Sequence, residues 1–245
     1  MTWCPRTFLF VFALWPALAL AAEPLRVAFD AGNPPAMWGE GRAVRGVQPA
    51  LLASAARTAR VSVAFQGMPW PRAMEGLARG EHCVGGAYKN AERMAQYQFS
   101  ESFRDETVVA VALAHSPLKA LPRITDLRGL RVGLHRGWSY GEELDAALDD
   151  PAMQVTRLTF GNRLFLALES GKVDVVLTDG ESVAHEARGL RQPVRVLAEL
   201  SRNGTHLMCP LGAAYAEALA RLNPVIRSQR DGSAWAALTQ QQLKR

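Results

Sequence analysis

The residues at 137–141 have the types and the spacing of a catalytic serine motif. They read GWSYG, which has the form G-x-S-x-G, and they stand between a strand-like and a helix-like segment, the context that a nucleophile elbow requires. Asp179 and then His185 or His206 follow in the hydrolase order Ser, Asp, His. No HGGG-like oxyanion loop precedes the motif, and short matches of this kind are common. A serine hydrolase through Ser139 is therefore kept as an alternative.

The same turn could instead bind an anion. A Gly-x-Ser turn that opens a helix exposes backbone N–H groups and the positive end of the helix dipole. Ser139 could donate to a ligand carboxylate there, or it could be an N-cap with Glu142 at the capping-box position. The sequence leaves both roles open.

Asp179 and three tryptophans are further candidates for a ligand site. Asp179 ends the strand-like segment VDVVLTD, and ligands bind at the carboxyl ends of parallel strands in open α/β sheets. An Asp-Gly pair at this point is equally compatible with a simple helix cap. Trp38, Trp70 and Trp138 fall in or beside loops next to strands, where aromatic rings either line a cleft or pack in the core.

Patterns that would hold a metal, a nucleotide or a nucleic acid are missing from the sequence. The five histidines make no HExxH motif, Cys/His pairs at zinc spacing do not occur, and there is neither a G-x-x-x-x-G-K-[ST] loop nor a G-x-G-x-x-G after the first strand. The 28 Lys and Arg and the 23 Asp and Glu are scattered, without a basic block interleaved with aromatics. We therefore predict no cofactor, no metal and no nucleic-acid partner.

The first residues have the pattern of a secretory signal peptide over residues 1–21. MTWCPR carries one positive charge, TFLFVFALWPALAL is a short apolar run, and Ala19-Leu20-Ala21 supplies small residues for cleavage. The apolar run is short for a membrane span and is quickly followed by polar sequence. We expect the mature chain to begin near Ala22 and to work in an oxidising compartment such as a bacterial periplasm.

Two cysteines remain in the mature chain, Cys83 and Cys209. Each lies in an apolar stretch, and buried free thiols behave as small hydrophobic side chains. We interpret them as two core residues and do not predict a disulfide, although one would be possible in this compartment.

Strand-like and helix-like segments alternate along the mature chain. A first series runs from LRVAFDA (25–31) to ETVVAVALA (106–114), and a second begins at RVGLH (131–135) after the connector 115–130. The later segments VRVLAEL and THLMCPLG are each strand-like. Strands separated by helices of this length build parallel sheets from βαβ units. Because the same order begins twice, the sequence predicts two similar α/β lobes.

Six segments of the mature chain together resemble one family in their order. They are LRVAFDAGNPP, GVQPALLASAA, PWPRAMEGLARGEH, NAERMAQYQFSESF, ITDLRGLRVGLHRGWSY and LALESGKVDVVLTD. From Leu25 to the C-terminus the chain resembles the type 2 periplasmic solute-binding proteins of family 3, which include amino-acid-binding components of ABC importers.

The resemblance implies a two-lobed α/β fold of the periplasmic-binding-protein type 2, in which two α/β sandwiches are joined by two hinge strands. Lobe 1 would consist of residues 22–110 and 204–245, and lobe 2 of residues 111–203. The chain would cross between the lobes near 109–116 and 204–212, and the ligand would be enclosed in the cleft between them.

Site residues are carried over from the family position by position. Arg93 matches the arginine that clamps the ligand's α-carboxylate, a role that suits a planar guanidinium with two parallel donors. Ser139 matches the carboxylate contact of the second lobe, and Asp179 matches the acid that receives the α-ammonium. Trp70 and Asp30 match cleft positions on the first lobe.

The segment before the arginine departs from the family's pattern. It reads GGAYKN, so that Tyr88 or Asn90 stands where Ser or Thr is usual, and Lys89 adds a cation near the cleft. Asn33 replaces the family's aromatic before the proline turn. With Trp138 as a cleft wall, these positions complete the predicted ligand site.

We therefore predict a periplasmic solute-binding protein, and not an enzyme. It would capture a small polar, carboxylate-bearing and amino-acid-like solute as a monomer, and a membrane permease of an ABC importer would read its closure. The alternatives are a ligand-sensing module that feeds no transporter, and an enzyme on the same scaffold, either a lyase or the serine hydrolase through Ser139.

Overall fold

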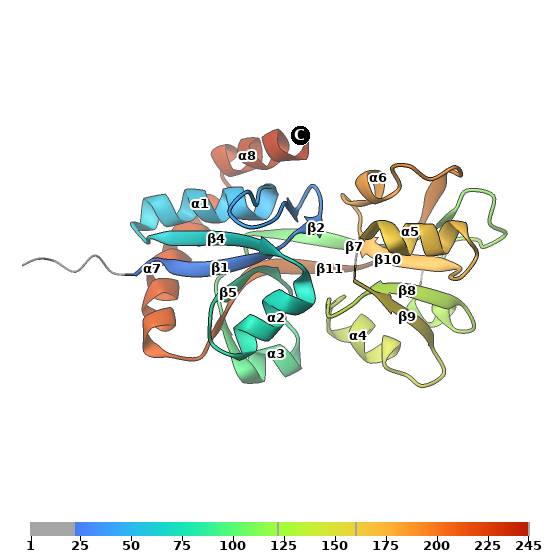
Figure 1. Ribbon diagram of the computed structural model, residues 1–245, viewed down its shortest axis with the longest axis horizontal. Coiled ribbons are helices and arrows are strands. Elements are labelled where there is room, and N and C mark those ends of the chain that lie inside the picture. The colour runs from blue at the N-terminus through green and yellow to red at the C-terminus, as the bar shows by residue number, and fades with distance from the viewer. Residues whose placement is uncertain (1–22, 122, 160, 245) are drawn as a thin grey trace, which may run out of the picture.

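The computed structural model describes residues 23–121, 123–159 and 161–244 (Figure 1). The predicted signal peptide, residues 1–21, lies outside the described residues. Figure 1 shows two α/β lobes side by side, joined by the strands β7 (Arg104–Leu113) and β11 (Val194–Pro210). In the described part of the chain, no helix has the length and the apolar character needed to cross a membrane.

The first lobe holds the strands β4, β1, β5 and β11 in that order, with helices from both ends of the chain packed on them. Its elements are β1 (Leu25–Asp30), β2 (Gly32–Asn33), β3 (Met37–Trp38), α1 (Val47–Ala59), β4 (Val63–Met68), α2 (Trp70–Ala78), β5 (Cys83–Ala87), α3 (Ala91–Gln96), β6 (Tyr97–Phe99), α7 (Ala213–Gln229) and α8 (Ser233–Leu243). β1 pairs in parallel with β4 and β5, as expected for βαβ units. β5 and β6 pair antiparallel with β11.

The second lobe repeats this arrangement with shorter helices. Its elements are η1 (Ile124–Leu127), β8 (Arg131–His135), α4 (Glu142–Leu148), β9 (Gln154–Leu158), α5 (Gly161–Glu169), β10 (Val175–Asp179) and α6 (Val183–Glu186). β8 pairs in parallel with β9 and β10, and β10 pairs antiparallel with β7. This is the two-lobed α/β fold that the resemblance implies.

The two sheets are continuous through β7 and β11. These strands pair antiparallel along their length, from Arg104 opposite Thr205 to Leu113 opposite Val194. The two strand-like segments VRVLAEL and THLMCPLG are thus parts of one strand of 17 residues. In a single long strand, the backbone N–H and C=O groups stay paired across the junction of the lobes. If the strand broke there, these groups would have to bind water instead.

The hydrophobic clusters indicate where the chain leaves one lobe for the other. Phe103 and Leu207 pack in a cluster of the first lobe, whereas Val108 and Leu197 pack in a cluster of the second. We propose that the chain crosses between Phe103 and Val108 and returns between Leu197 and Leu207. The first crossing lies a few residues before the lobe boundary after residue 110 that the resemblance implies.

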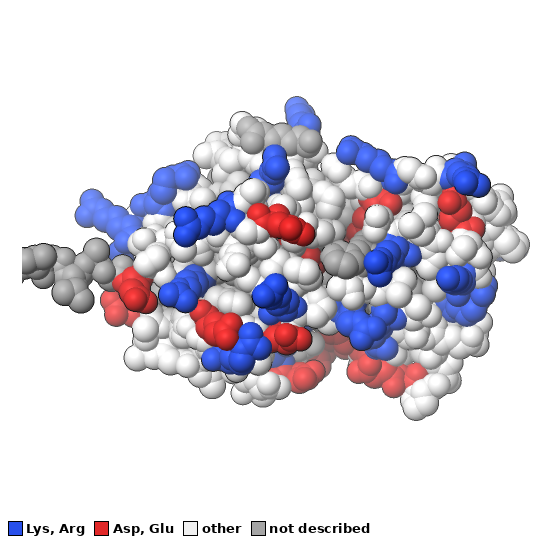
Figure 2. Space-filling model, viewed as in Figure 1, with Lys and Arg blue, Asp and Glu red and all other residues white. Residues whose placement is uncertain are grey.

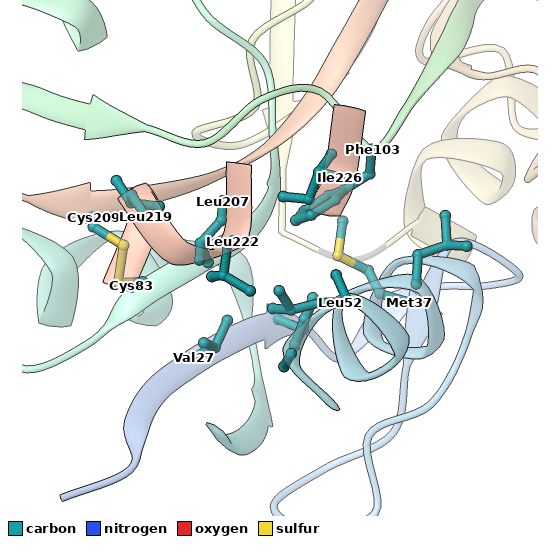
Figure 3. Packing of buried hydrophobic residues seen from close by; sticks show 14 of the residues in the cluster. Val27, Met37, Leu52, Cys83, Phe103, Leu207, Cys209, Leu219, Leu222 and Ile226 are labelled. Atoms are coloured by element: carbon teal, nitrogen blue, oxygen red, sulfur yellow. A yellow bond between two sulfur atoms is a disulfide. The ribbon is translucent and has the colours of Figure 1, made fainter. Parts of the chain in front are cut away.

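The core of the first lobe brings the first strand and the C-terminal helices of the described chain together. Figure 3 shows Val27 of β1 and Leu52 of α1 beside Leu222 of α7, and all three are buried. Trp235 of α8 belongs to the same cluster, and its Nε1 donates to the Phe103 carbonyl oxygen at 3.0 Å. The C-terminal helices therefore complete the first lobe.

The structure joins Cys83 and Cys209, which were interpreted as core residues, by a disulfide that the sequence did not predict. Both side chains are fully buried, as predicted, but they form a disulfide (Figure 3). The antiparallel register sets Gly85 opposite Leu207 and Val84 opposite Met208, which brings the two cysteine Cα atoms within 4.2 Å. Neither spacing nor composition could reveal this register, because the two residues lie 126 positions apart.

Charged side chains are distributed over both lobes. Figure 2 shows Lys and Arg scattered over one face, with Asp and Glu between them.

We expect the Cys83–Cys209 disulfide to contribute about 2–5 kcal/mol to the free energy of unfolding, because it closes a long loop in the unfolded chain. Urea unfolding of the oxidised and the reduced wild type measures this difference without changing the sequence. The double variant Cys83→Ala/Cys209→Ala should lose stability by a similar amount and should not respond to reductant. Equal stability of the oxidised and reduced wild type would contradict the prediction.

Candidate functional site

A cavity of about 30 Å³ lies between the lobes. It is much smaller than an open small-molecule site of about 300–1,000 Å³. The lining residues come from both lobes and from a hinge strand: Asn33, Met37, Trp70, Gly86, Tyr88, Arg93, Glu106, Trp138 and Ser139. Five of the eight residues that the sequence predicts for the site are among them.

Arg93 lies at the start of α3 and reaches into the junction of the lobes. Asn90 precedes the helix as N-cap, and its Oδ1 accepts a hydrogen bond from the Arg93 backbone N–H at 2.9 Å. The guanidinium is buried; its Nη1 donates to the Tyr88 carbonyl oxygen and its Nη2 to the Gly137 carbonyl oxygen, each at 3.0 Å. Burial lowers the pKa of Arg93, while the charges of Asp145 and Glu92 act in the opposite direction.

The turn before α4 differs from the predicted capping box. α4 begins at Glu142, and the residue at its N-cap is Gly141 with φ of 98°, so Ser139 is not the cap. The Glu142 carboxylate instead accepts from the Ala91 backbone N–H at 2.6 Å, across the cleft. The capping-box alternative for Ser139 is therefore wrong.

Asp145 accepts the hydrogen bonds that the donors of this turn could give to a ligand. Its carboxylate accepts from the Ser139 hydroxyl, from the Tyr140 backbone N–H at 2.7 Å and from Asn90 Nδ2 at 3.1 Å. A carboxylate of the protein thus stands where the sequence predicts a ligand carboxylate at Ser139. The sequence analysis missed this partner. Asp145 lies in α4, six positions after Ser139, and its side chain points back to the turn before the helix.

No catalytic triad forms around Ser139. Among the described residues, its hydrogen-bond partners are Asn90, Gly141 and Asp145, and none is a histidine. His206 lies in β11, where its Nδ1 is 2.8 Å from the Ser100 carbonyl oxygen. In the described part of the chain, no histidine is therefore hydrogen-bonded to Ser139 as a base.

Two tryptophans connect the lobes beside the cavity. Trp70 Nε1 donates to the Gly137 carbonyl oxygen at 2.8 Å, and Trp138 Nε1 donates to Asp30 Oδ2 at 3.1 Å. The Trp138 ring also stacks on His135, with 4.0 Å between the ring centroids. Both tryptophan side chains therefore bridge the two lobes beside the cavity.

Asp30 and Asn90 lie next to the cavity without lining it. Asp30 ends β1; its Oδ1 accepts from the Gly32 backbone N–H at 2.9 Å, while its Oδ2 accepts from Trp138. Burial raises the pKa of Asp30, and both hydrogen bonds lower it. Asn90 holds the start of α3 and reaches Asp145 in the other lobe.

Asp179 ends β10 and is almost completely buried. It is not among the residues that line the cavity. Its Oδ1 accepts from the Glu181 backbone N–H and its Oδ2 lies 3.2 Å from the Ser182 hydroxyl. That hydroxyl also lies 2.6 Å from Asn33 Oδ1. Because Ser182 has one proton for two acceptors, a protonated Asp179 would satisfy all three groups. Burial, with the charges of Glu106 and Glu181, raises the pKa of Asp179 well above its usual value.

Glu106 is the cavity residue that the sequence analysis missed. It stands in β7, with Oε1 accepting from Gln48 Nε2 at 2.7 Å and Oε2 from the Tyr88 hydroxyl at 3.0 Å. Thr205 in turn donates to Gln48 Oε1 at 3.2 Å. The available signal was an acid just before the apolar part of β7, and it gave no indication of the inward direction of the side chain.

The two-lobed fold and an interlobe cavity lined by polar and aromatic residues define a type 2 periplasmic binding protein. The chain belongs to the bacterial extracellular solute-binding proteins, family 3, whose model matches residues 25–205. None of the curated proteins matches it.

Solved structures of binding proteins and of a sensor share the fold. A substrate-binding protein of an amino acid ABC transporter has a TM-score of 0.74 at 18% identity, over 91% of this chain and 100% of that chain. The arginine-, lysine-, histidine-binding protein ArtJ from Geobacillus stearothermophilus has a TM-score of 0.76 at 17% identity, over 91% and 96%. A histidine kinase sensor domain has a TM-score of 0.77 at 20% identity, over 90% and 96%.

We expect Asp179 to give stability at acid pH. Its pKa is raised in the folded state, so its contribution is fully present below its ordinary pKa of 3.8 and is lost as the pH rises through the folded value. The unfolding free energy of wild type minus that of Asp179→Asn should therefore fall between pH 4 and pH 7, by at most about 1.4 kcal/mol per pH unit. Urea unfolding at several pH values measures it.

Asp126→Asn is a matched control of opposite sign. A hydrogen bond from Arg123 lowers the pKa of Asp126, so its contribution is present at neutral pH and is lost as the pH falls. The difference between wild type and Asp126→Asn should therefore rise with pH. A difference for Asp179→Asn that also rises would show that the folded state prefers the ionised Asp179.

Proposed function

We propose that this chain is a periplasmic binding protein that encloses a small carboxylate-bearing, amino-acid-like solute between its lobes for an ABC importer. The membership of family 3 supports solute binding, and several structures of the same fold are named as amino-acid-binding proteins. Ligand and transporter are inferences from the site and from these relatives.

The observation that carries the proposal is the buried cation at the cavity. Arg93 lines the cavity and is 8% exposed, yet it takes part in none of the ion pairs among residues 23–121, 123–159 and 161–244. A buried charge is costly unless it is paired. A ligand carboxylate would supply the partner.

Arg93 has donors left for such a ligand. Its two hydrogen bonds to carbonyl oxygens use two of the five N–H groups of a guanidinium. The remaining N–H groups suit a carboxylate, which accepts charge-assisted hydrogen bonds from arginine. We infer that Arg93, rather than Ser139, is the principal carboxylate contact, because Asp145 already accepts from Ser139.

The same residues would couple binding to closure. Arg93 and Trp70 on the first lobe both donate to the Gly137 carbonyl oxygen on the second. A carboxylate on Arg93 would be enclosed by contacts that exist only when the lobes meet. Ligand binding would then favour the closed state through differential contacts about the β7–β11 hinge.

A sensory module is the second candidate, because a histidine kinase sensor domain has this fold. Both functions use the same closure, and they differ in the protein that reads it. Uptake of labelled ligand by cells with and without the gene separates them, since an importer component is required for uptake and a sensor is not.

A thermal-shift screen of amino acids, polyamines, dicarboxylates and small sugars tests the ligand class. A ligand at 100 times its Kd should stabilise the protein by about 2.7 kcal/mol, and we expect the stabilising compounds to carry a carboxylate. Stabilisation by sugars or polyamines alone would contradict the proposal.

Arg93→Lys should then weaken binding of the stabilising compound about 10- to 100-fold. The reason is that charge-assisted hydrogen bonds contribute about 1.5–3 kcal/mol, and 1.4 kcal/mol is tenfold in affinity. Arg79→Lys is the matched control, at an exposed arginine paired with Glu81, and should bind like wild type. Calorimetric titration measures both variants. Wild-type affinity in a folded Arg93→Lys variant would refute the assignment.

A further inference from the structure

We propose that Glu142 and Asp145, two acids of α4 on the second lobe, form a latch that holds the lobes together without a solute. The latch engages hydrogen-bond donors that a solute carboxylate could otherwise use. It therefore opposes the entry of a solute and lowers the apparent affinity of the protein for it. Its contacts lie within the chain, so the latch is independent of the proposed function and of the class of solute.

The latch joins the start of α3 to the start of α4. The Ala91 backbone N–H donates to Glu142 Oε2 at 2.6 Å, and Asn90 Nδ2 donates to Asp145 Oδ2 at 3.1 Å. Ala91 is the first residue of α3, where a backbone N–H has no acceptor within its own helix. A carboxylate of the other lobe supplies that acceptor, so the lobes satisfy each other's polar groups at this contact.

Two further contacts between the lobes have the same direction. Trp70 and Arg93 on the first lobe both donate to the Gly137 carbonyl oxygen on the second. At these contacts and at the latch, donors of the first lobe meet oxygen atoms of the second. The second lobe thus presents to the first lobe the kind of atom that a solute carboxylate would present.

With the lobes in contact, the central cavity has no room for a solute of the size of an amino acid. Its volume is about 30 Å³, which is about the volume that one water molecule takes up in the liquid. A larger space of about 300 Å³ shares Arg93, Trp138 and Ser139 with this cavity. Asn90 and Asp145 also line the larger space, so an anionic solute that entered it would meet the Asp145 carboxylate.

Asp145 is held in position by its own lobe. Its Oδ1 accepts from the Tyr140 backbone N–H at 2.7 Å, and the Ser139 hydroxyl donates to its Oδ2. Burial lowers the pKa of Arg93, and the charge of Asp145 raises it. Because Asp145 is tethered in the same chain, its effective concentration at the contact with Asn90 exceeds that of a dilute free anion.

Such a latch lowers the apparent affinity for every solute that needs the lobes apart in order to enter. The apparent dissociation constant is the intrinsic constant divided by the fraction of molecules in the competent state. One hydrogen bond to a charged group corresponds to about 10- to 100-fold in an equilibrium constant. Loss of the Asn90–Asp145 contact should therefore shift the balance of open and closed molecules by about this factor.

Hydrogen exchange of the Ala91 backbone N–H tests the latch in the protein without added solute. The mature chain is refolded from urea with its disulfide intact, which removes any compound carried through purification. By NMR, the Ala91 N–H should exchange at least tenfold more slowly in wild type than in Glu142→Ala. The Arg93 N–H, which donates to Asn90 within the first lobe, should exchange equally in both proteins. An Ala91 N–H that exchanges equally fast in both would overturn the proposal.

Small-angle X-ray scattering without added solute measures the opening of the lobes. Asn90→Asp keeps a side-chain oxygen for the N-cap of α3 and sets a second carboxylate against Asp145, so it should give a larger radius of gyration than wild type. Exchanging the two groups in Asn90→Asp/Asp145→Asn restores a hydrogen bond and should return the wild-type radius.

Glu143→Gln is the matched control for these variants. Glu143 is the exposed acid next to Glu142 on α4, so this variant should scatter like wild type. Equal radii of gyration for a folded Asn90→Asp variant and wild type would overturn the proposal.

The outcomes separate the latch from the proposed function. If no carboxylate-bearing compound binds, while the Ala91 N–H is protected and Asn90→Asp opens the lobes, the latch is supported and the proposed function fails. If such a compound binds and the wild type is as open as Asn90→Asp, the latch alone is overturned.

Discussion

The pairing of β7 with β11 is the constraint on which the rest of the structure depends. Each strand passes through both sheets, and their hydrogen bonds continue across the junction. Paired strands occupy the junction itself, so the lobes contact each other beside these strands. One such contact is the hydrogen bond from Arg93 to the Gly137 carbonyl oxygen. The Cys83–Cys209 disulfide links β11 to β5 on the first-lobe side.

The distribution of charge in the cleft follows from this constraint. The buried Arg93 guanidinium donates to carbonyl oxygens, while Glu106 and Asp145 accept hydrogen bonds from donors of the protein itself. The turn before α4 is the clearest case, because Asp145 satisfies the N–H and hydroxyl donors that would otherwise attract an anion. Under the proposed function, an anionic ligand would thereby be directed to Arg93.

Particular residues show how far sequence reasoning reaches. Arg93, Tyr88, Trp70, Trp138 and Ser139 were predicted for the site, and all five line the cavity. They could be predicted because short sequence segments in a fixed order identify both the fold and the place of each residue within it. Ser139 and Asp179 are hydrogen-bonded mainly to residues two to six positions along the chain, and the family pattern does not identify these partners.

The sequence by itself determined the two α/β lobes, because alternating strand and helix patterns are local consequences of burial and backbone geometry. It also predicted Arg93 for the ligand site, and Arg93 lines the cavity. Only the tertiary structure decided three features. They are the disulfide, the hydrogen bond from Ser139 to Asp145, and the presence of Glu106 in the cavity. Each of these is set by strand register or by the direction of a side chain, and both are fixed when distant segments pack together.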